Sequence, residues 1–183
     1  MSNPAFIVDG YTEKLIIGKI CPGKPIRRTD LNGNSVTIKA IANKISSLIR
    51  LLNNKYYPII IVIDREDRQE DCEKIIENLK IELNNKGHIN EDIRISVADK
   101  MLENWIIADW KLISESVEKP EITDSLSGSS IIKKHKGSYG KTTDGVELFT
   151  NADPTVIYQN SPSFRTFIDS LEGIDCTYTA FEK

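Results

Sequence analysis

Acidic residues follow each of two apolar segments that have the character of buried strands. They are Asp9 and Glu13 after residues 5–8, and Asp64, Glu66 and Asp67 after residues 57–63. In an open parallel sheet, ligands bind beyond the carboxyl ends of the strands. If the chain stays extended after Ile63, the carboxylates of Asp64 and Glu66 point the same way, and an acid at the tip of a neighbouring strand converges on them.

Carboxylates held that close together need a cation, and hard oxygen ligands suit Mg²⁺ or Mn²⁺. The sequence therefore predicts a divalent metal site at this edge of the sheet. The simpler alternative for any single acid is a solvated turn residue, because strand ends are wet and prone to turns.

Apolar spacing predicts the elements that position these acids. Short apolar runs predict strands over 5–8, 57–63 and 92–98, and steps of three and four predict helices over 12–21, 36–52, 72–86 and 101–113. The polar segment 24–34 is expected to be a loop. The order is β-α-α-β-α-β-α, which favours an α/β fold with a mainly parallel sheet and helices on both faces.

The length of 183 residues fits one domain. Residues 1–113 form the expected α/β core. Residues 114–183 are less periodic, with a helix near 163–171, and we expect them to form a C-terminal extension packed on the same domain.

Composition excludes several classes of protein. The chain holds 24 Lys+Arg and 27 Asp+Glu, for a net charge of −3, so it is not a uniformly basic nucleic-acid coat protein. The longest apolar run, Ile59–Ile63, is far below the roughly 20 residues of a membrane-spanning helix. We therefore expect a soluble, cytoplasmic protein without a membrane partner.

Three cysteines, Cys21, Cys72 and Cys176, lie far apart in the sequence. They form no CxxC pair, and the two histidines do not complete a zinc pattern with them. We expect buried or half-buried thiols in a reducing cytosol.

Three ordered motifs resemble the Toprim domain, the metal-binding fold of topoisomerases, DnaG-type primases and OLD (overcoming lysogenisation defect) nucleases. The motifs are FIVDGYTEKL around Asp9, IVIDRED around Asp64, and ENWIIAD from Glu103 to Asp109. The chain is most similar to small stand-alone Toprim-like proteins of uncharacterised function, some of them linked to phage defence. Asp9 stands where Glu is usual in the family, and Glu66 stands where Asp is usual.

This resemblance implies a Toprim-like fold and metal-assisted phosphodiester cleavage of DNA or RNA. Asp64, Glu66 and Asp67 would hold Mg²⁺ or Mn²⁺, and Asp9 or Glu13 would bridge the metal or move a proton. A lysine commonly assists in OLD-type relatives. Lys141 is the candidate here, because the glycines around it let the backbone approach a phosphate.

Other basic residues are candidates for binding the substrate: Arg65, Lys134 and Lys136. The alternatives are that Arg65 pairs with the acids beside it and that the basic stretch is a solvated loop. Glu103 and Asp109 are further candidates. They lie six residues apart on the helix predicted over 101–113, so a straight helix cannot direct both into one site.

The first functional hypothesis is a metal-dependent Toprim nuclease, an effector in a bacterial defence or toxin system. A weakly basic patch favours a partner, such as the ABC- or AAA-type ATPase found beside many Toprim nucleases, and a homo-oligomer is also open. The second is a catalytically inactive Toprim-like interaction or sensor subunit, for which Asp9 and Glu66 are the evidence. A phosphate-accepting receiver domain is not expected, because it needs paired acids after the first strand and a single Asp after the third. Topoisomerase activity is not expected either, because it needs a nucleophilic tyrosine on a further domain.

Overall fold

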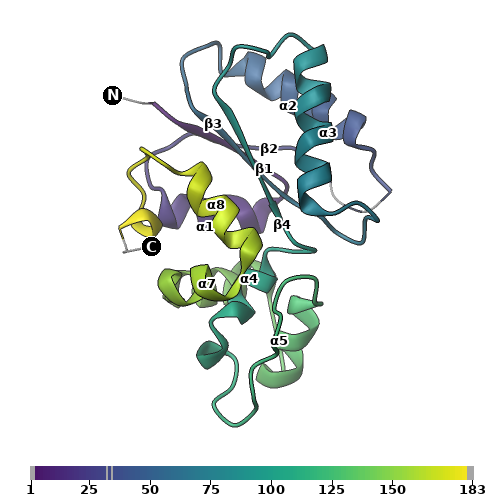
Figure 1. Cartoon of the computed structure of the whole chain (residues 1–183). Coiled ribbons are helices and arrows are strands. Elements are labelled where there is room, and N and C mark those ends of the chain that lie inside the picture. The colour runs from purple at the N-terminus through teal and green to yellow at the C-terminus, as the bar shows by residue number, and fades with distance from the viewer. Residues whose placement is uncertain (1–2, 32, 34, 181–183) are drawn as a thin grey trace.

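A four-stranded parallel sheet forms the centre of the protein. The computed structural model describes residues 3–31, 33 and 35–180, and Figure 1 shows the sheet between its helices. The strands are β1 (Ala5–Val8), β2 (Ile26–Arg28), β3 (Ile59–Asp64) and β4 (Ile93–Ala98). They lie in the order β2-β1-β3-β4, and every neighbouring pair is parallel. With 49% of the chain helical, the α/β fold predicted from the sequence is confirmed.

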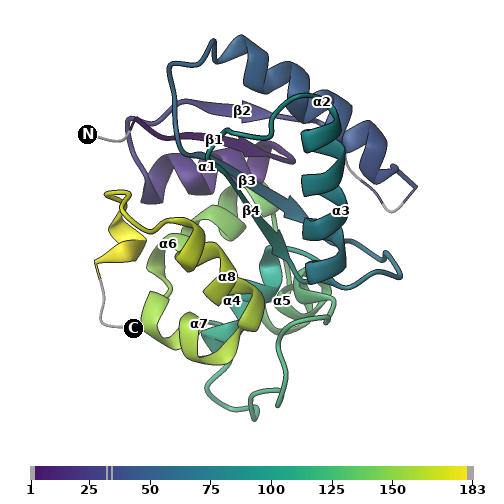
Figure 2. The same cartoon turned by 45° about the horizontal axis from the view of Figure 1, so that its top comes forward.

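Helices cover both faces of this sheet (Figures 1 and 2). One face carries α2 (Ile38–Leu51) and α3 (Cys72–Asn85), and the other carries α1 (Tyr11–Ile20), α4 (Glu103–Ala108) and α8 (Pro162–Ser170). Alternate residues of a strand point to opposite faces. Ile7 therefore joins the core beneath α2 and α3, whereas Val8 joins the core on the α1 side.

The helix caps follow from local sequence. Thr37 begins α2 by accepting the Ala40 N–H at 3.2 Å, and Asp71 begins α3 by accepting the Lys74 N–H at 2.8 Å. No helix among the described residues is long and apolar enough to cross a membrane.

The expectation of a loop over 24–34 is wrong for residues 26–28. Ile26–Arg28 form β2, an edge strand that pairs with β1 alone, with Phe6 opposite Ile26 and Val8 opposite Arg28. An edge strand of three residues with two arginines carries no apolar periodicity, so the pattern cannot reveal it. Asn32 and Asn34 of the predicted loop lie outside the described residues.

The continuous helix predicted over 101–113 is also wrong. Helix α4 ends at Ala108, and a separate 3₁₀ turn covers Trp110–Leu112. Asp109 lies at the break with φ −91° and ψ 76°, and its carboxylate accepts the Asp153 N–H at 2.9 Å. This bond ties the break to the start of α7 (Pro154–Asn160).

The C-terminal segment joins the core on the α1 side of the sheet. It contains α5 (Gly128–Lys136), α6 (Val146–Asn151), α7 and α8. Trp105 of α4 is fully buried, and its ring lies 5.1 Å from Phe167 and 5.4 Å from Phe164 of α8 between centroids. Its indole N–H donates to the Ser163 hydroxyl at 2.8 Å, so α8 fixes the helix that carries Glu103.

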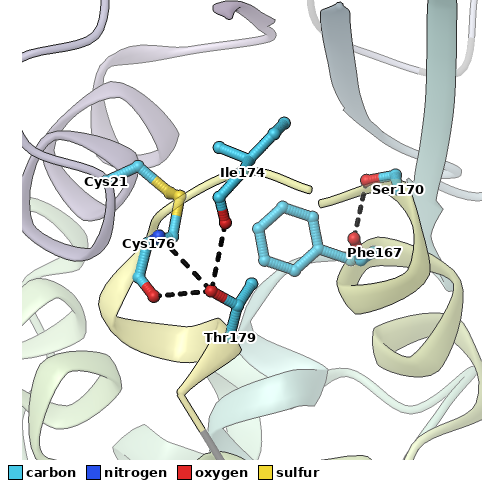
Figure 3. Close-up of a disulfide and its surroundings, with 6 residues drawn as sticks. All are labelled: Cys21, Phe167, Ser170, Ile174, Cys176 and Thr179. Atoms are coloured by element: carbon cyan, nitrogen blue, oxygen red, sulfur yellow. Dashed lines mark hydrogen bonds between the residues drawn. A yellow bond between two sulfur atoms is a disulfide. The ribbon is translucent and has the colours of Figure 1, made fainter. Parts of the chain in front are cut away.

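A disulfide between Cys21 and Cys176 corrects the expectation of three thiols. Cys21 ends α1 and Cys176 precedes the last 3₁₀ turn, so two cysteines 155 residues apart meet in space (Figure 3). The spacing of cysteines in the sequence cannot predict which of them pair over such a separation. The Thr179 hydroxyl bonds the carbonyl oxygens of Ile174 and Cys176 and so orders the turn. Cys72 is a free, half-buried thiol, and burial raises its pKa to about 12.

Candidate active site

Asp9 and Asp64 meet at the carboxyl edge of the sheet because β1 and β3 are parallel neighbours. The Asp64 N–H donates to Asp9 Oδ2 at 2.9 Å, and the Thr29 hydroxyl donates to Asp9 Oδ1 at 3.2 Å. Asp9 is only 6% exposed. Burial, with a smaller contribution from the Glu13 carboxylate, raises the pKa of Asp9 to about 7, although both hydrogen bonds oppose the shift.

Asp64 ends β3 and is half-buried. Burial raises its pKa well above the ordinary value of 3.8, and the carboxylates of Glu13, Asp9 and Glu103 raise it further. Asp9, the acid at the tip of the neighbouring strand, therefore lies beside Asp64, the first of the two acids on which it was predicted to converge.

Two helices add acids to this edge. Glu13 lies in the first turn of α1, directly after the turn at Gly10, and burial together with Glu103 raises its pKa. Glu103 begins α4 and is 3% exposed. Asp9, Glu13, Asp64 and Glu103 therefore form one electrostatically coupled group, which we call the acid cluster.

Lys141 supplies a positive charge to the acid cluster. Its Nζ lies 3.1 Å from Glu103 Oε1, and the Tyr139 hydroxyl donates to the same oxygen at 3.3 Å. Partial burial lowers the pKa of Lys141, but the carboxylates of Glu103, Asp64 and Glu13 together outweigh it and the net shift is upward. Burial and Glu103 likewise raise the pKa of Tyr139. Lys141 stays protonated and remains about half exposed at the rim of the cluster.

Glu66 and Asp67 do not extend the line of β3. Glu66 has a left-handed φ of 58°, and its N–H donates to the Lys100 carbonyl at 2.8 Å. The expectation that Asp64 and Glu66 point the same way is therefore wrong, because the turn after β3 is bonded to the end of β4 rather than extended. Glu66 still contributes to the raised pKa of Asp64, less than Glu13, Asp9 and Glu103 do. Asp67 pairs with Lys100 at 3.0 Å.

The other predicted residues lie outside the acid cluster. The Arg65 Nε lies 2.5 Å from Asp99, so Arg65 pairs with an acid that follows β4 and not with the acids beside it in the sequence. Lys134 and Lys136 are exposed on α5. Asp109 accepts the N–H of Asp153, the residue before α7, and only Glu103 of the two acids predicted on one helix contributes to the cluster.

The acid cluster suits a hard divalent cation in the chemistry of its donors. It offers carboxylate oxygens, and the raised pKa values of Asp9, Glu13 and Asp64 reflect first the burial of these carboxylates and then their mutual repulsion, which a bound cation would relieve. Within the part of the chain that the structure describes, no three His, Cys, Asp or Glu side chains are arranged so that they could already hold a metal ion. Binding would therefore require the carboxylates to reorient.

Sequence reasoning missed two residues that shape the cluster. Thr29 holds Asp9 from the edge of the sheet, and it escaped notice because β2 was not predicted. Tyr139 reaches Glu103, and its position depends on Gly145, where an added Cβ would lie 2.5 Å from the Tyr139 hydroxyl. The GSYGKTTDG stretch contains Tyr139, but its glycines single out Lys141 and give no sign that Tyr139 reaches Glu103.

A family model described as a domain of unknown function (DUF4276) matches residues 8–172. The chain belongs to the DUF4276 family. No curated protein and no solved structure matches it. The range matched by DUF4276 includes all four acids of the cluster and Lys141.

Proposed function

We propose that this DUF4276 protein is a Mg²⁺- or Mn²⁺-dependent nuclease that cleaves phosphodiester bonds in DNA or RNA. One observation supports the proposal above the others: acids from neighbouring parallel strands and from two helices gather at the carboxyl edge of the sheet, where burial and their charges raise the pKa of Asp64. The order of the acidic motifs, which resembles that of Toprim nucleases, is consistent with it.

The acids and Lys141 have separable roles in this proposal. Asp64 and Glu13 would hold the cation, which when bound would polarise the phosphate and lower the pKa of a water ligand. Asp9, with a pKa of about 7, can hold or release a proton at neutral pH. Lys141 would contact a phosphate oxygen; it pairs with Glu103, whose Oε1 also accepts the Tyr139 hydroxyl.

Cleavage assays with supercoiled plasmid and with total tRNA test the proposal. We expect cleavage of at least one substrate in Mg²⁺ or Mn²⁺, none in EDTA, and a loss of about 100-fold or more in Asp64→Asn. Asp92→Asn is the matched control, since Asp92 precedes β4 at the opposite edge of the sheet and pairs with Arg94. Cleavage that persists in EDTA or in Asp64→Asn would refute the metal-carboxylate mechanism.

A second candidate function is a Toprim-like interaction or sensor subunit of an ATPase-containing complex. Two observations favour it: Glu103 and Lys141 neutralise each other, and both oxygens of Asp9 already accept hydrogen bonds. A protein that binds an ATPase partner but cleaves no substrate with or without that partner would support this function.

A cytoplasmic location and a role in phage defence or toxicity belong to the same proposal. In a reducing cytoplasm the cellular thiol pool would act to reduce the Cys21–Cys176 disulfide to two free thiols. The count of free thiols in protein quenched directly from cells therefore reports on the compartment.

A further inference from the structure

Tyr11 presents an aromatic ring to solvent at the start of the helix that carries Glu13. It begins α1, two residues after Asp9, and is 51% exposed. Every other Phe, Trp or Tyr in the described part of the chain is buried or half-buried. An exposed ring near the carboxyl edge of the sheet offers an aromatic face on which a planar ring of a ligand can stack.

Arg28 lies against this ring. Its guanidinium carbon is 5.4 Å from the centre of the Tyr11 ring, within the range of a cation–π contact. Arg28 ends β2 and pairs in register with Val8, the last residue of β1. Because the strands are parallel, Arg28 reaches the same edge of the sheet as Asp9 and Asp64.

A further cation lies next to the ring. Lys14 is exposed and follows Tyr11 by three residues on α1, a spacing that makes the two side chains neighbours on the helix surface. Asp30 forms an ion pair with Arg28 at 3.4 Å. This ion pair does not involve Lys14, so it does not neutralise the Lys14 charge. We call Tyr11, Lys14 and Arg28 the aromatic-basic ledge.

We infer that the aromatic-basic ledge binds single-stranded nucleic acid, with an unstacked base against the Tyr11 ring and the flanking phosphates on Arg28 and Lys14. The inference rests on the proposed nuclease function and specifies its substrate. An exposed ring beside cations suits a base that is free to leave its neighbours, whereas the bases of a duplex are already stacked on one another. The ledge would deliver the adjacent phosphate to the acid cluster.

Binding measured without metal tests the ledge independently of cleavage. Fluorescence anisotropy of a labelled single-stranded DNA or RNA oligonucleotide is followed in EDTA at low salt, with the full chain. We expect Tyr11→Ala to weaken binding about 5- to 150-fold, which is the range of one base–aromatic stack, and Tyr11→Phe to retain it. Leu51→Ala, at a 71% exposed position at the end of α2, is the matched control and should bind like the wild type.

An oligonucleotide that carries abasic sites separates stacking from charge. Tyr11→Ala should leave its binding unchanged, whereas Arg28→Ala should weaken binding to both the abasic and the normal strand and reduce the salt dependence. The inference is overturned by equal losses on normal, abasic and duplex oligonucleotides, by no loss in Tyr11→Ala, or by no binding of any single strand. A ledge that passes these tests in a protein that never cleaves would refute the nuclease function alone.

Discussion

Replacing Asp9 by Asn should stabilise the metal-free protein at alkaline pH. In the unfolded chain Asp9 releases its proton near pH 3.8, but in the folded protein its pKa is about 7. Between these values the folded state binds a proton that the unfolded state has lost, so stability falls as pH rises from 3.8 towards 7. At about 1.4 kcal/mol per pKa unit, the loss is about 4 kcal/mol at pH 8.

The asparagine side chain in Asp9→Asn has nearly the same shape as the aspartate and carries no charge. Its amide oxygen can accept the Asp64 N–H, and its NH₂ group can donate to the Thr29 hydroxyl oxygen. The variant should therefore avoid the cost of the buried charge without losing its hydrogen bonds. At pH 8 in EDTA we expect a free energy of unfolding up to about 4 kcal/mol higher than that of the wild type, with a midpoint temperature roughly 10 °C higher.

Urea unfolding at pH 4, 6 and 8, in EDTA and then in Mg²⁺, measures this effect. The difference between Asp9→Asn and wild type should be small at pH 4 and grow with pH. Added Mg²⁺ should narrow it, because the cation stabilises the wild-type cluster preferentially. Asp92→Asn, at an exposed position, should show no such pH dependence. Parallel pH profiles for Asp9→Asn and wild type would refute the reasoning, as would a variant less stable at pH 8.

Three further changes test other parts of the structure. Lys141→Ala should lower cleavage at least about 10-fold while Lys141→Arg retains part of it, because only the first removes the charge beside Glu103; steady-state cleavage rates measure both. Gly128→Ala should destabilise the fold by about 1–3 kcal/mol, since a Cβ there would lie 2.9 Å from the backbone nitrogen of Asn104 and force α4 to move; urea unfolding beside Ser130→Ala on the same helix checks it. Cys176→Ser should lower the free energy of unfolding by up to about 5 kcal/mol, because the disulfide closes a long loop. If reduction of the disulfide left the unfolding midpoint of the wild-type protein unchanged, this prediction would be contradicted.

The sequence was sufficient to place Asp9 and Asp64 at one edge of the sheet. Each follows a run of buried residues, and parallel strands bring such positions together whatever the loops between them do. The strand order, however, depends on long-range packing that apolar periodicity does not encode. The three-residue strand β2 was missed for this reason, and with it Thr29 and Arg28.

Contacts between segments far apart in the chain could not be predicted from local sequence patterns either. The flanking glycines make Lys141 a candidate, but nothing in the local pattern indicates that it pairs with Glu103, 38 residues earlier in the chain. The helix carrying Glu103 was predicted too long, because the break at Asp109 is fixed by a bond to Asp153 rather than by a local helix-stopping residue. The turn at Glu66 depends in the same way on the Lys100 carbonyl.

Direct binding of Mn²⁺ tests the central claim, that the acids at the ends of β1 and β3 form one divalent cation site. Electron paramagnetic resonance of free Mn²⁺, titrated with the wild type, Asp64→Asn and Asp92→Asn, gives the affinity of each protein. We predict saturable binding by the wild type and Asp92→Asn, competition by Mg²⁺, and a marked loss in Asp64→Asn. Equal Mn²⁺ affinity in Asp64→Asn and wild type, or no binding by any of the three, would contradict the account.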